Sequence, residues 1–262
     1  MQSIAIVTGA TSGVGREFVR QLDQGHGGPL NQIWLVARDA TALAQVAAET
    51  ATPTRVLALD LTLDSSYESL RDELDREEGL VVQWLVNCAG FGRFGGLGEI
   101  GEKANANMVR LNCLAVVECC YHALPHMVAG SRIINLSSVA ALAPQPYLSV
   151  YSATKRFVLD FSRTLDHELG GSGIHVTAVC PKFMRTGFLD DPGNAEQVRR
   201  MTTIGFEPVD AVVAKALAAA IRGRATCVPS WDVKAIHVAT KLLPSAWVMA
   251  GEDLLFDLAS RR

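Results

Sequence analysis

The alternation of short apolar runs with longer amphipathic stretches constrains the fold of this chain more than any other sequence feature. Seven apolar runs are typical of strands, at residues 3–8, 32–36, 55–59, 81–86, 132–136, 175–179 and 226–228. Between them lie stretches with apolar residues at helical spacing, at 14–24, 41–50, 65–78, 105–129, 150–170 and 208–222. Strands that alternate with helices form parallel sheets through right-handed crossovers. We therefore predict an α/β fold, a doubly wound, mostly parallel seven-stranded sheet with helices on both faces.

The composition fits one large folded domain. The chain has 262 residues, of which 49% are hydrophobic, enough to bury a sizeable core. No repeat, low-complexity tract or linker interrupts it, so we predict a single domain over residues 1–262. The net charge of -3 argues against a nucleic-acid partner. No run approaches the ~18 apolar residues of a membrane span and no secretory signal is recognisable, so we expect a cytoplasmic protein.

The cysteines and histidines do not form a metal-binding pattern. The six cysteines lie in apolar segments without C-x-x-C spacing, which indicates reduced core thiols. His122 and His126 are four residues apart on an expected helix, a spacing that a metal ion could use. Pro125 lies between them and no carboxylate motif accompanies them, so packing or a surface position is the favoured interpretation. We therefore expect no metal site.

Three glycines follow the first expected strand, in the stretch IVTGATSGVGREF at residues 6–18. Ligands of open parallel sheets bind beyond the carboxyl ends of the strands, where this loop lies. Gly9, Gly13 and Gly15 could loosen a turn, or they could let a phosphate approach bare backbone. The helix expected from Val14 directs its unpaired N–H groups and positive dipole end at the same space. The position of the glycines therefore favours phosphate binding.

The spacing T-G-x-x-x-G-x-G, from Thr8 to Gly15, resembles that of the short-chain dehydrogenase/reductase family. Further motifs similar to those of the family follow in order, namely Asp60-Leu61, NCAG at 87–90, Asn112, INLSS ending at Ser138, YSATK at 151–155 and VCPKFMRTGF at 179–188. The resemblance extends to about residue 190. It implies a single-domain, Rossmann-type NAD(P)-binding fold and an oxidoreductase that acts on CH–OH groups.

The resemblance also implies which residues hold the cofactor. The glycines of the first loop would cradle the pyrophosphate, and Asp60 would meet the edge of the adenine ring. Gly90 would let the cofactor ribose pass close to the chain, while Asn87 would tie the central strands of the sheet together. The implied cofactor-binding residues are Gly9, Thr11, Ser12, Gly13, Val14, Gly15, Arg38, Asp60, Leu61, Asn87, Ala89, Gly90, Tyr151, Lys155, Pro181, Met184 and Thr186.

The loop after the sixth strand departs from the family pattern at one position. By resemblance, Pro181 and Thr186 would flank the nicotinamide carboxamide, and Met184 would offer its backbone N–H. Lys182 stands where the family has glycine. A local difference in backbone is therefore expected at this part of the cofactor site.

The resemblance implies a catalytic tetrad of Asn112, Ser138, Tyr151 and Lys155. The tyrosine and the lysine are four residues apart at a helix start, so both project from one face. Taken alone, they could equally be a surface pair. In the family, the serine holds the substrate oxygen and the asparagine positions a water for proton relay. A free tyrosine has a pKa near ~10, and we expect the nearby ammonium and a bound nicotinamide to lower the pKa of Tyr151.

The end of the second strand bears on the choice of cofactor. An NAD-preferring enzyme usually places an acidic residue at position 37, but this chain has Ala37 followed by Arg38. A cation there suits the 2′-phosphate of NADP(H). Alternatively, Arg38 could cap the strand or pair with Asp39. Ser12 stands where some NADP users place a second basic residue. We predict NADP(H), with NAD(H) as the alternative.

Substrate choice is expected to depend on residues beyond the sixth strand. Residues 187–206 are typical of a mobile substrate lid. Residues 231–262 carry apolar residues at helical spacing, which favours a core or subunit contact over docking on a membrane surface or a lipophilic substrate. Apolar residues near the site hint at a lipophilic carbonyl such as a steroid, a bile acid or an acyl chain. These residues are Phe91, Phe94, Phe183, Met184 and Phe188.

Two functions remain open at this point. The first is NADP(H)-dependent hydride transfer between the nicotinamide and a small-molecule carbonyl or secondary alcohol. The second is a catalytically silent NADP(H)-sensing protein, which would not need Tyr151 and Lys155. The intact tetrad favours the enzyme. In the family, the helices that carry Asn112 and Tyr151 also form the subunit interface, which implies a homodimer or homotetramer.

Overall fold

A seven-stranded parallel sheet forms the centre of the molecule, in a computed structural model that describes residues 1–143, 145–185 and 206–234. The strand order is β3-β2-β1-β4-β5-β6-β7, and every neighbouring pair is parallel. The strands are β1 (Gln2–Thr8), β2 (Gln32–Ala37), β3 (Thr54–Ala58), β4 (Leu80–Asn87), β5 (Arg132–Leu136), β6 (His175–Val179) and β7 (Thr226–Cys227). The predicted fold class is confirmed.

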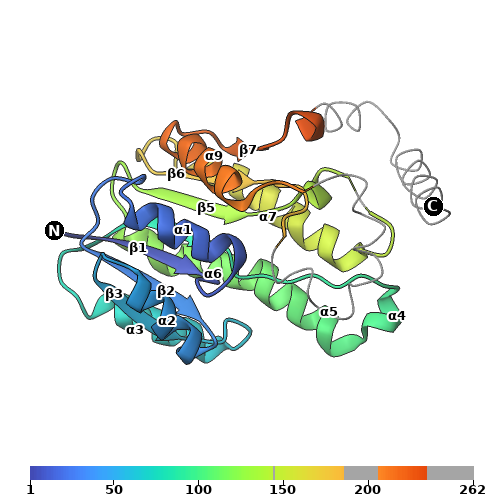
Figure 1. Cartoon of the computed structure of the whole chain (residues 1–262), viewed down its shortest axis with the longest axis horizontal. Helices are drawn as coiled ribbons and strands as arrows, with labels where there is room; N and C mark the ends of the chain where they lie inside the picture. The colour runs from blue at the N-terminus through green and yellow to red at the C-terminus, as the bar shows by residue number, and fades with distance from the viewer. Residues whose placement is uncertain (144, 186–205, 235–262) are drawn as a thin grey trace.

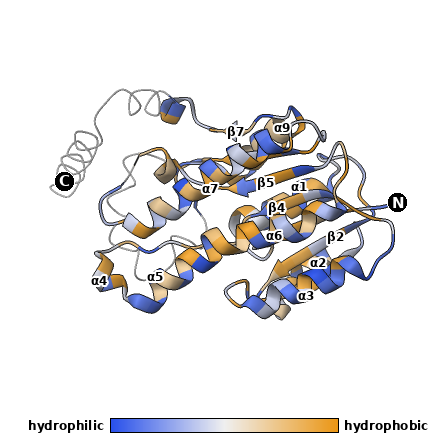
Figure 2. Cartoon of the chain, turned by 180° about the vertical axis from the view of Figure 1, so that it is seen from behind, coloured by the Kyte–Doolittle hydropathy of each residue, from blue (hydrophilic) through white to orange (hydrophobic). Residues whose placement is uncertain are grey.

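Helices cover both faces of this sheet (Figures 1 and 2). One face packs against α1, α2 and α9, and the other against α3, α6 and α7. The helices are α1 (Gly13–Asp23), α2 (Ala40–Glu49), α3 (Asp64–Asp75), α4 (Leu97–Ile100), α5 (Glu102–Val109), α6 (Ala115–Ala123), α7 (Ser149–Glu168) and α9 (Val209–Ile221).

The apolar strand sequences are explained by this two-sided packing. Successive side chains of a strand point to opposite faces of the sheet. In β1, Ala5 and Val7 pack toward α1, whereas Ile4 and Ile6 pack toward α3 and α6. All four side chains are fully buried. A continuous apolar run is therefore what a central parallel strand requires.

The region between β4 and β5 differs from the single helix predicted over residues 105–129. It contains α4, α5, a π-helical turn η1 (Arg110–Leu114), α6 and a 3₁₀ turn η2 (Leu124–His126). Pro125 lies in the first positions of η2, where its missing N–H is tolerated, and ends the α-helical hydrogen bonding. The α-helical hydrogen bonding thus begins at Glu102, three residues before the predicted start at 105. It ends at Ala123, before the predicted end at 129.

A chain of buried polar groups joins the central strands to α7. The Asn87 amide at the end of β4 donates to Asn135 Oδ1 on β5, with a distance of 2.8 Å. Asn135 in turn donates to Ser162 Oγ on α7 at 2.9 Å, and the Ser162 hydroxyl donates to the Val158 carbonyl. The expected tie between the central strands is confirmed, and it extends to the helix that carries the YSATK motif.

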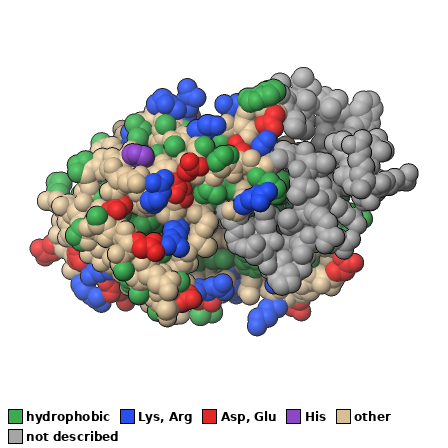
Figure 3. Space-filling view, in the orientation of Figure 1, with side chains coloured by type: hydrophobic (Ala, Val, Ile, Leu, Met, Phe, Trp, Pro, Cys, Tyr) green, Lys and Arg blue, Asp and Glu red, His purple; other side chains and the backbone are tan. Residues whose placement is uncertain are grey.

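The surface of the described residues shows no membrane-spanning element and no single sign of charge. Within residues 1–143, 145–185 and 206–234, none of the helices combines the length and apolar character that crossing a bilayer requires. Acidic and basic side chains are intermixed on the face seen in Figure 3.

We expect Ser162→Ala to destabilise the protein. Asn135 is fully buried and would lose its acceptor, so its amide would be left unsatisfied. The free energy of unfolding should fall by about 1–3 kcal/mol in a urea or thermal titration. Ser149→Ala, at the exposed start of the same helix, is the matched control and should change little. Equal stability of the two variants would contradict this role for the buried chain.

Candidate active site

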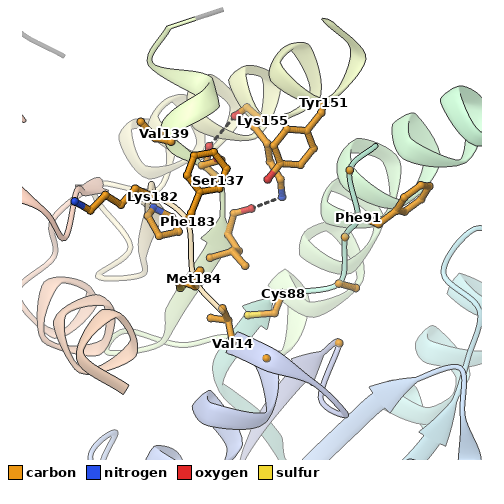
Figure 4. Close-up of a pocket in the computed structure, with 18 of the residues that line it drawn as sticks. Val14, Cys88, Phe91, Ser137, Val139, Tyr151, Lys155, Lys182, Phe183 and Met184 are labelled. Carbon is orange, nitrogen blue, oxygen red and sulfur yellow. Dashed lines mark hydrogen bonds between the residues drawn. The ribbon is translucent and has the colours of Figure 1, made fainter. Parts of the chain in front are cut away.

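A cavity of about 350 Å³ opens at the carboxyl ends of the central strands (Figure 4). Its wall combines the glycine loop after β1, the loop after β4, the end of β5, the start of α7 and the loop after β6. The lining residues predicted from the sequence are Gly9, Ser12, Gly13, Val14, Gly15, Ala89, Gly90, Ser138, Tyr151, Lys155, Pro181 and Met184. A neighbouring cavity of about 450 Å³ shares Gly9, Ser12, Ala89 and Gly90 with it and extends over β2 and β3.

The glycine loop is too tight for other residues. Gly9 has a φ of 68°, and its N–H donates to the Val36 carbonyl at 2.8 Å. A Cβ on Gly15 would lie 2.2 Å from the Gly9 carbonyl oxygen, so α1 could not approach β1 so closely with alanine there. The N-cap of α1, Ser12, makes no side-chain cap bond, and no acidic residue lies in the first turn. The N–H groups at this helix end therefore fit a pyrophosphate.

The loop after β4 is fixed against β1 and leaves room for a ligand. Thr8 Oγ1 accepts from the N–H groups of Cys88 and Ala89, both at 3.1 Å. A Cβ on Gly90 would lie 2.9 Å from Asn112 Oδ1 and 3.5 Å from Lys155 Nζ. Glycine is therefore required where this loop passes between two members of the predicted tetrad.

Tyr151 and Lys155 project from the first turns of α7 into the cavity (Figure 4). Lys155 Nζ lies 5.7 Å from the centroid of the Tyr151 ring and donates to the Leu136 carbonyl at 2.8 Å. The Ser137 hydroxyl donates to the Lys155 carbonyl at 2.7 Å, which fixes α7 to the end of β5. The Ser138 hydroxyl hydrogen-bonds to that of Tyr151. The structure thus brings three of the four predicted catalytic residues together.

The electrostatics of this pair differ from the expectation. Burial raises the pKa of Tyr151 to about 12, and the hydrogen bond from Ser138 offsets this only in part. Burial also lowers the pKa of Lys155 to about 8. The expected lowering of the Tyr151 pKa depends on a bound nicotinamide as well as on the ammonium; without the nicotinamide, desolvation of the phenolate dominates. Near neutral pH, Tyr151 is therefore a neutral phenol beside a mostly protonated lysine.

Asn112, the fourth predicted catalytic residue, lies in the π-helical turn η1 and is buried. Its Oδ1 accepts from the Phe91 N–H at 3.0 Å, and its Nδ2 donates to the Phe91 carbonyl at 2.8 Å. The same Nδ2 donates to Thr154 Oγ1 at 3.1 Å. The side chain thus clamps the loop after β4 to α7. It does not line the cavity itself.

The neighbouring cavity is lined by Arg38, the residue predicted to meet the 2′-phosphate. Arg38 is exposed on its rim, next to Ala37, and Thr11 and Leu61 also line it. Asp39 does not pair with Arg38, because its carboxylate accepts from the Thr41 and Ala42 N–H groups at the start of α2. No ion pair involves Arg38 among the described residues.

Asp60, predicted to contact adenine, is half-buried at the edge of this neighbouring cavity and does not line it. Its Oδ1 accepts from both the N–H and the hydroxyl of Thr62, at 3.0 and 2.8 Å. In this structure the Asp60 carboxylate therefore stabilises a local turn after β3.

Lys182, which departs from the family pattern, lines the cavity, but its ammonium points away from it (Figure 4). Its N–H donates to Glu207 Oε2 at 3.0 Å, and its ammonium pairs with Asp232 at 2.6 Å. Glu207 is buried and also accepts from the Ser230 hydroxyl. The lysine thus joins the loop after β6 to the segment after β7. Thr186 lies outside the described residues.

One wall of the cavity is apolar. Phe94 and Leu148 are buried and form a cluster with Tyr151 and Phe183. Phe91 and Met184 also line the cavity, as predicted, while Phe188 lies outside the described residues. Sequence reasoning did not identify Leu148, Gln145, or the Leu136 carbonyl that accepts from Lys155. A main-chain acceptor has no residue signature, so no motif could have revealed it.

The two histidines with possible metal-ligand spacing pair with carboxylates, and the cysteines are free thiols. His122 Nε2 lies 3.4 Å from Glu118, and His126 Nε2 lies 3.2 Å from Asp75. The described residues contain no group of three or more potential metal ligands. All six cysteines are free thiols, at Cys88, Cys113, Cys119, Cys120, Cys180 and Cys227. Burial raises their pKa values, so they are protonated at neutral pH.

Comparisons with known proteins agree with this geometry. The family model of the short chain dehydrogenases matches residues 3–197. A very-long-chain 3-oxoacyl-CoA reductase from Macaca fascicularis is 33% identical over 193 residues, which cover 70% of this chain but only 59% of that protein. A short-chain dehydrogenase from Sphingobium yanoikuyae in complex with NADPH superposes with a TM-score of 0.77 at 28% identity, covering 92% of each chain.

A third relative concerns bulky substrates. The bulky-bulky ketone specific alcohol dehydrogenase from Comamonas testosteroni superposes with a TM-score of 0.72 at 25% identity, covering 91% of this chain and 92% of that one. The family model matches most of the chain, and the chain forms the seven-stranded parallel sheet that the resemblance to this family implies. The chain therefore belongs to the short-chain dehydrogenase family.

Proposed function

We propose that this protein is an NADP(H)-dependent oxidoreductase that transfers a hydride between the nicotinamide and a lipophilic ketone or its secondary alcohol. The observation that carries this proposal is one cavity with a polar wall of Tyr151, Ser138 and Lys155 and an adjoining apolar wall of Phe94, Leu148 and Phe183. The polar wall suits a carbonyl oxygen, and the apolar wall suits a hydrocarbon substituent. The relatives that act on 3-oxoacyl-CoA or on bulky ketones support the same class of substrate.

The mechanism follows from what each side chain can do. A bound nicotinamide supplies the hydride for reduction or accepts it for oxidation. Ser138 hydrogen-bonds to the Tyr151 hydroxyl, so both hydroxyl groups can meet one substrate oxygen. In reduction, Tyr151 donates its proton to that oxygen as the hydride reaches the carbon. The raised pKa of Tyr151 keeps it protonated for this step at neutral pH.

Lys155 acts through charge and position. Its ammonium is buried beside the tyrosine ring, where it stabilises the phenolate left by proton transfer. One N–H is held by the Leu136 carbonyl, which leaves the others for the cofactor ribose. Asn112 positions this assembly by holding Phe91 and Thr154, and the proposed relay water would bind beside it.

The preference for NADP(H) is supported by the charge at the end of β2. Arg38 is exposed on the rim of the neighbouring cavity, and Asp39 is occupied as the N-cap of α2. The guanidinium is therefore available for a 2′-phosphate. Ala37 places no carboxylate there to repel it. The similar structures include one in complex with NADPH and one in complex with NAD, so the preference rests on Arg38 and Ala37.

Several wider features belong to this proposal. We assign residues 1–262 to one domain, with a substrate lid at 187–206 and a helical tail at 231–262, most of which lies outside the described residues. Phe157, exposed on α7, supports a homodimer or homotetramer through that helix. The free thiols support a reducing, cytoplasmic location.

Tyr151→Phe tests the proton donor. The variant loses only the hydroxyl, so turnover should fall by about 10²–10⁴-fold while cofactor affinity stays nearly unchanged. Reduced-nicotinamide absorbance gives the turnover, and quenching of protein fluorescence gives the dissociation constant of NADPH. Unchanged turnover would remove Tyr151 from the mechanism.

The pH profile tests Lys155. The pKa of Lys155 is lowered to about 8, so its positive charge is present below that pH and is lost as the pH rises through it. Reduction should therefore be fastest below pH 8 and fall above it, since Tyr151 stays protonated throughout. Lys155→Ala should weaken NADPH binding, slow turnover and remove this fall. A fall near pH 8 that persists in the variant would assign it to another group.

Cofactor choice can be measured without a variant. NADPH should bind about tenfold or more tightly than NADH, because only NADPH offers Arg38 a charged acceptor. The double variant Ala37→Asp with Arg38→Leu should reverse this preference by providing an acceptor for the ribose hydroxyls. Equal dissociation constants for the two cofactors in the wild-type protein would show that Arg38 does not bind the phosphate.

A further inference from the structure

A buried carboxylate, that of Glu207, is bonded to the loop that follows β6. Glu207 lies two residues before α9, and only 8% of the residue is exposed. Its Oε2 accepts from the Lys182 N–H at 3.0 Å, and its own N–H donates to the Phe183 carbonyl at 2.9 Å. A charged side chain is seldom buried this far unless hydrogen bonds satisfy it. Two consecutive loop residues are thus joined to Glu207 through their main-chain atoms.

The segment after β7 supports the same carboxylate from the other side. The buried Ser230 hydroxyl donates to Glu207 Oε1, and Asp232 accepts from the Lys182 ammonium at 2.6 Å. We call Lys182, Glu207, Ser230 and Asp232 the Glu207 junction. Within the described part of the chain, this junction meets the cavity only through Lys182. Its other members therefore act on the cavity through the loop that they hold.

The loop held by the Glu207 junction forms part of the cavity wall (Figure 4). Residues 181–184 line the cavity but form neither helix nor strand, so no ladder of main-chain hydrogen bonds fixes them. Phe183 packs in the apolar cluster of the cavity. The Pro181 carbonyl accepts from the Val139 N–H at 2.8 Å, and the next two residues are held by Glu207. An irregular loop keeps one position only where such contacts hold it.

We infer that Glu207 is a positioning residue for the nicotinamide end of the cofactor. By fixing the main chain of Lys182 and Phe183, it keeps the loop after β6 where the nicotinamide binds. This inference rests on the proposed function, including the contacts implied for Pro181 and Met184 with the nicotinamide. The adenosine and phosphate groups would meet other loops, those after β1 and β2. Glu207 therefore contributes to cofactor affinity through the nicotinamide end.

Two matched ligands test this role. Calorimetry gives the dissociation constants of NADPH and of 2′-phospho-ADP-ribose, which is the same molecule without the nicotinamide. Glu207→Ala loses both side-chain hydrogen bonds, so the loop must be ordered when the cofactor binds. The dissociation constant of NADPH should therefore rise about tenfold, whereas that of 2′-phospho-ADP-ribose should change less than about twofold. Glu68→Ala, at an exposed position of α3, is the control and should change neither.

Two further variants separate positioning from folding. Glu207→Gln keeps an oxygen for the Lys182 N–H and gains an NH₂ that can donate to the Ser230 hydroxyl oxygen, so NADPH affinity should stay within about twofold of the wild type. Ser230→Ala removes one support of Glu207 and should raise the dissociation constant of NADPH about fourfold, again without affecting 2′-phospho-ADP-ribose. This milder variant tests the inference even if Glu207→Ala does not fold.

The outcomes distinguish this inference from the proposed function. An equal rise for both ligands, or unchanged NADPH affinity in both alanine variants of the junction, would overturn the inference and leave cofactor use intact. A loss in Glu207→Gln as large as in Glu207→Ala would also overturn it, because the hydrogen bonds would then not be what matters. Wild-type protein that binds neither ligand would overturn the proposed function, and with it this inference.

Discussion

The burial of one ammonium group, that of Lys155, determines the arrangement of the whole site. Only 5% of the residue is exposed, and a buried cation is unfavourable unless polar groups surround it. The Leu136 carbonyl supplies one partner, and its position depends on where β5 ends. Gly90 leaves space on the other side, since a Cβ there would approach Nζ to 3.5 Å. The sheet edge, the loop after β4 and α7 must therefore keep their relative positions for the lysine to remain charged.

The polar chain inside the protein provides that rigidity. Asn87, Asn135 and Ser162 link β4, β5 and α7 by hydrogen bonds between buried side chains. Ser137 makes a second link between β5 and α7, through the Lys155 carbonyl. Each bond contributes modestly, but leaving any one donor unpaired in this interior would be costly. The catalytic geometry is thus a property of the sheet core as much as of the cavity.

Much of this arrangement could be predicted from the sequence, because it depends on spacing. The alternation of strand-like and helix-like stretches predicted the doubly wound sheet. The four-residue spacing of Tyr151 and Lys155 predicted that both project from one face of α7. The π-helical turn around Asn112 could not be predicted, since the apolar pattern continues through it unchanged. The burial that raises the Tyr151 pKa could not be predicted either, because it depends in part on Phe94 and Phe183, which come from other loops.

The replacement of a family glycine by Lys182 shows why local motifs alone mislead. A lysine at a glycine position suggests a disturbed backbone, yet Lys182 lines the cavity with its ammonium pointing away from it (Figure 4). Its N–H donates to Glu207, 25 residues further along the chain. Its ammonium donates to Asp232, 50 residues further along. Glu207 also accepts from the Ser230 hydroxyl, and Asp232 also accepts from the Val233 N–H. The departure from the motif is therefore compensated by contacts that exist only in the folded chain, and it secures the segment after β7 to the loop after β6.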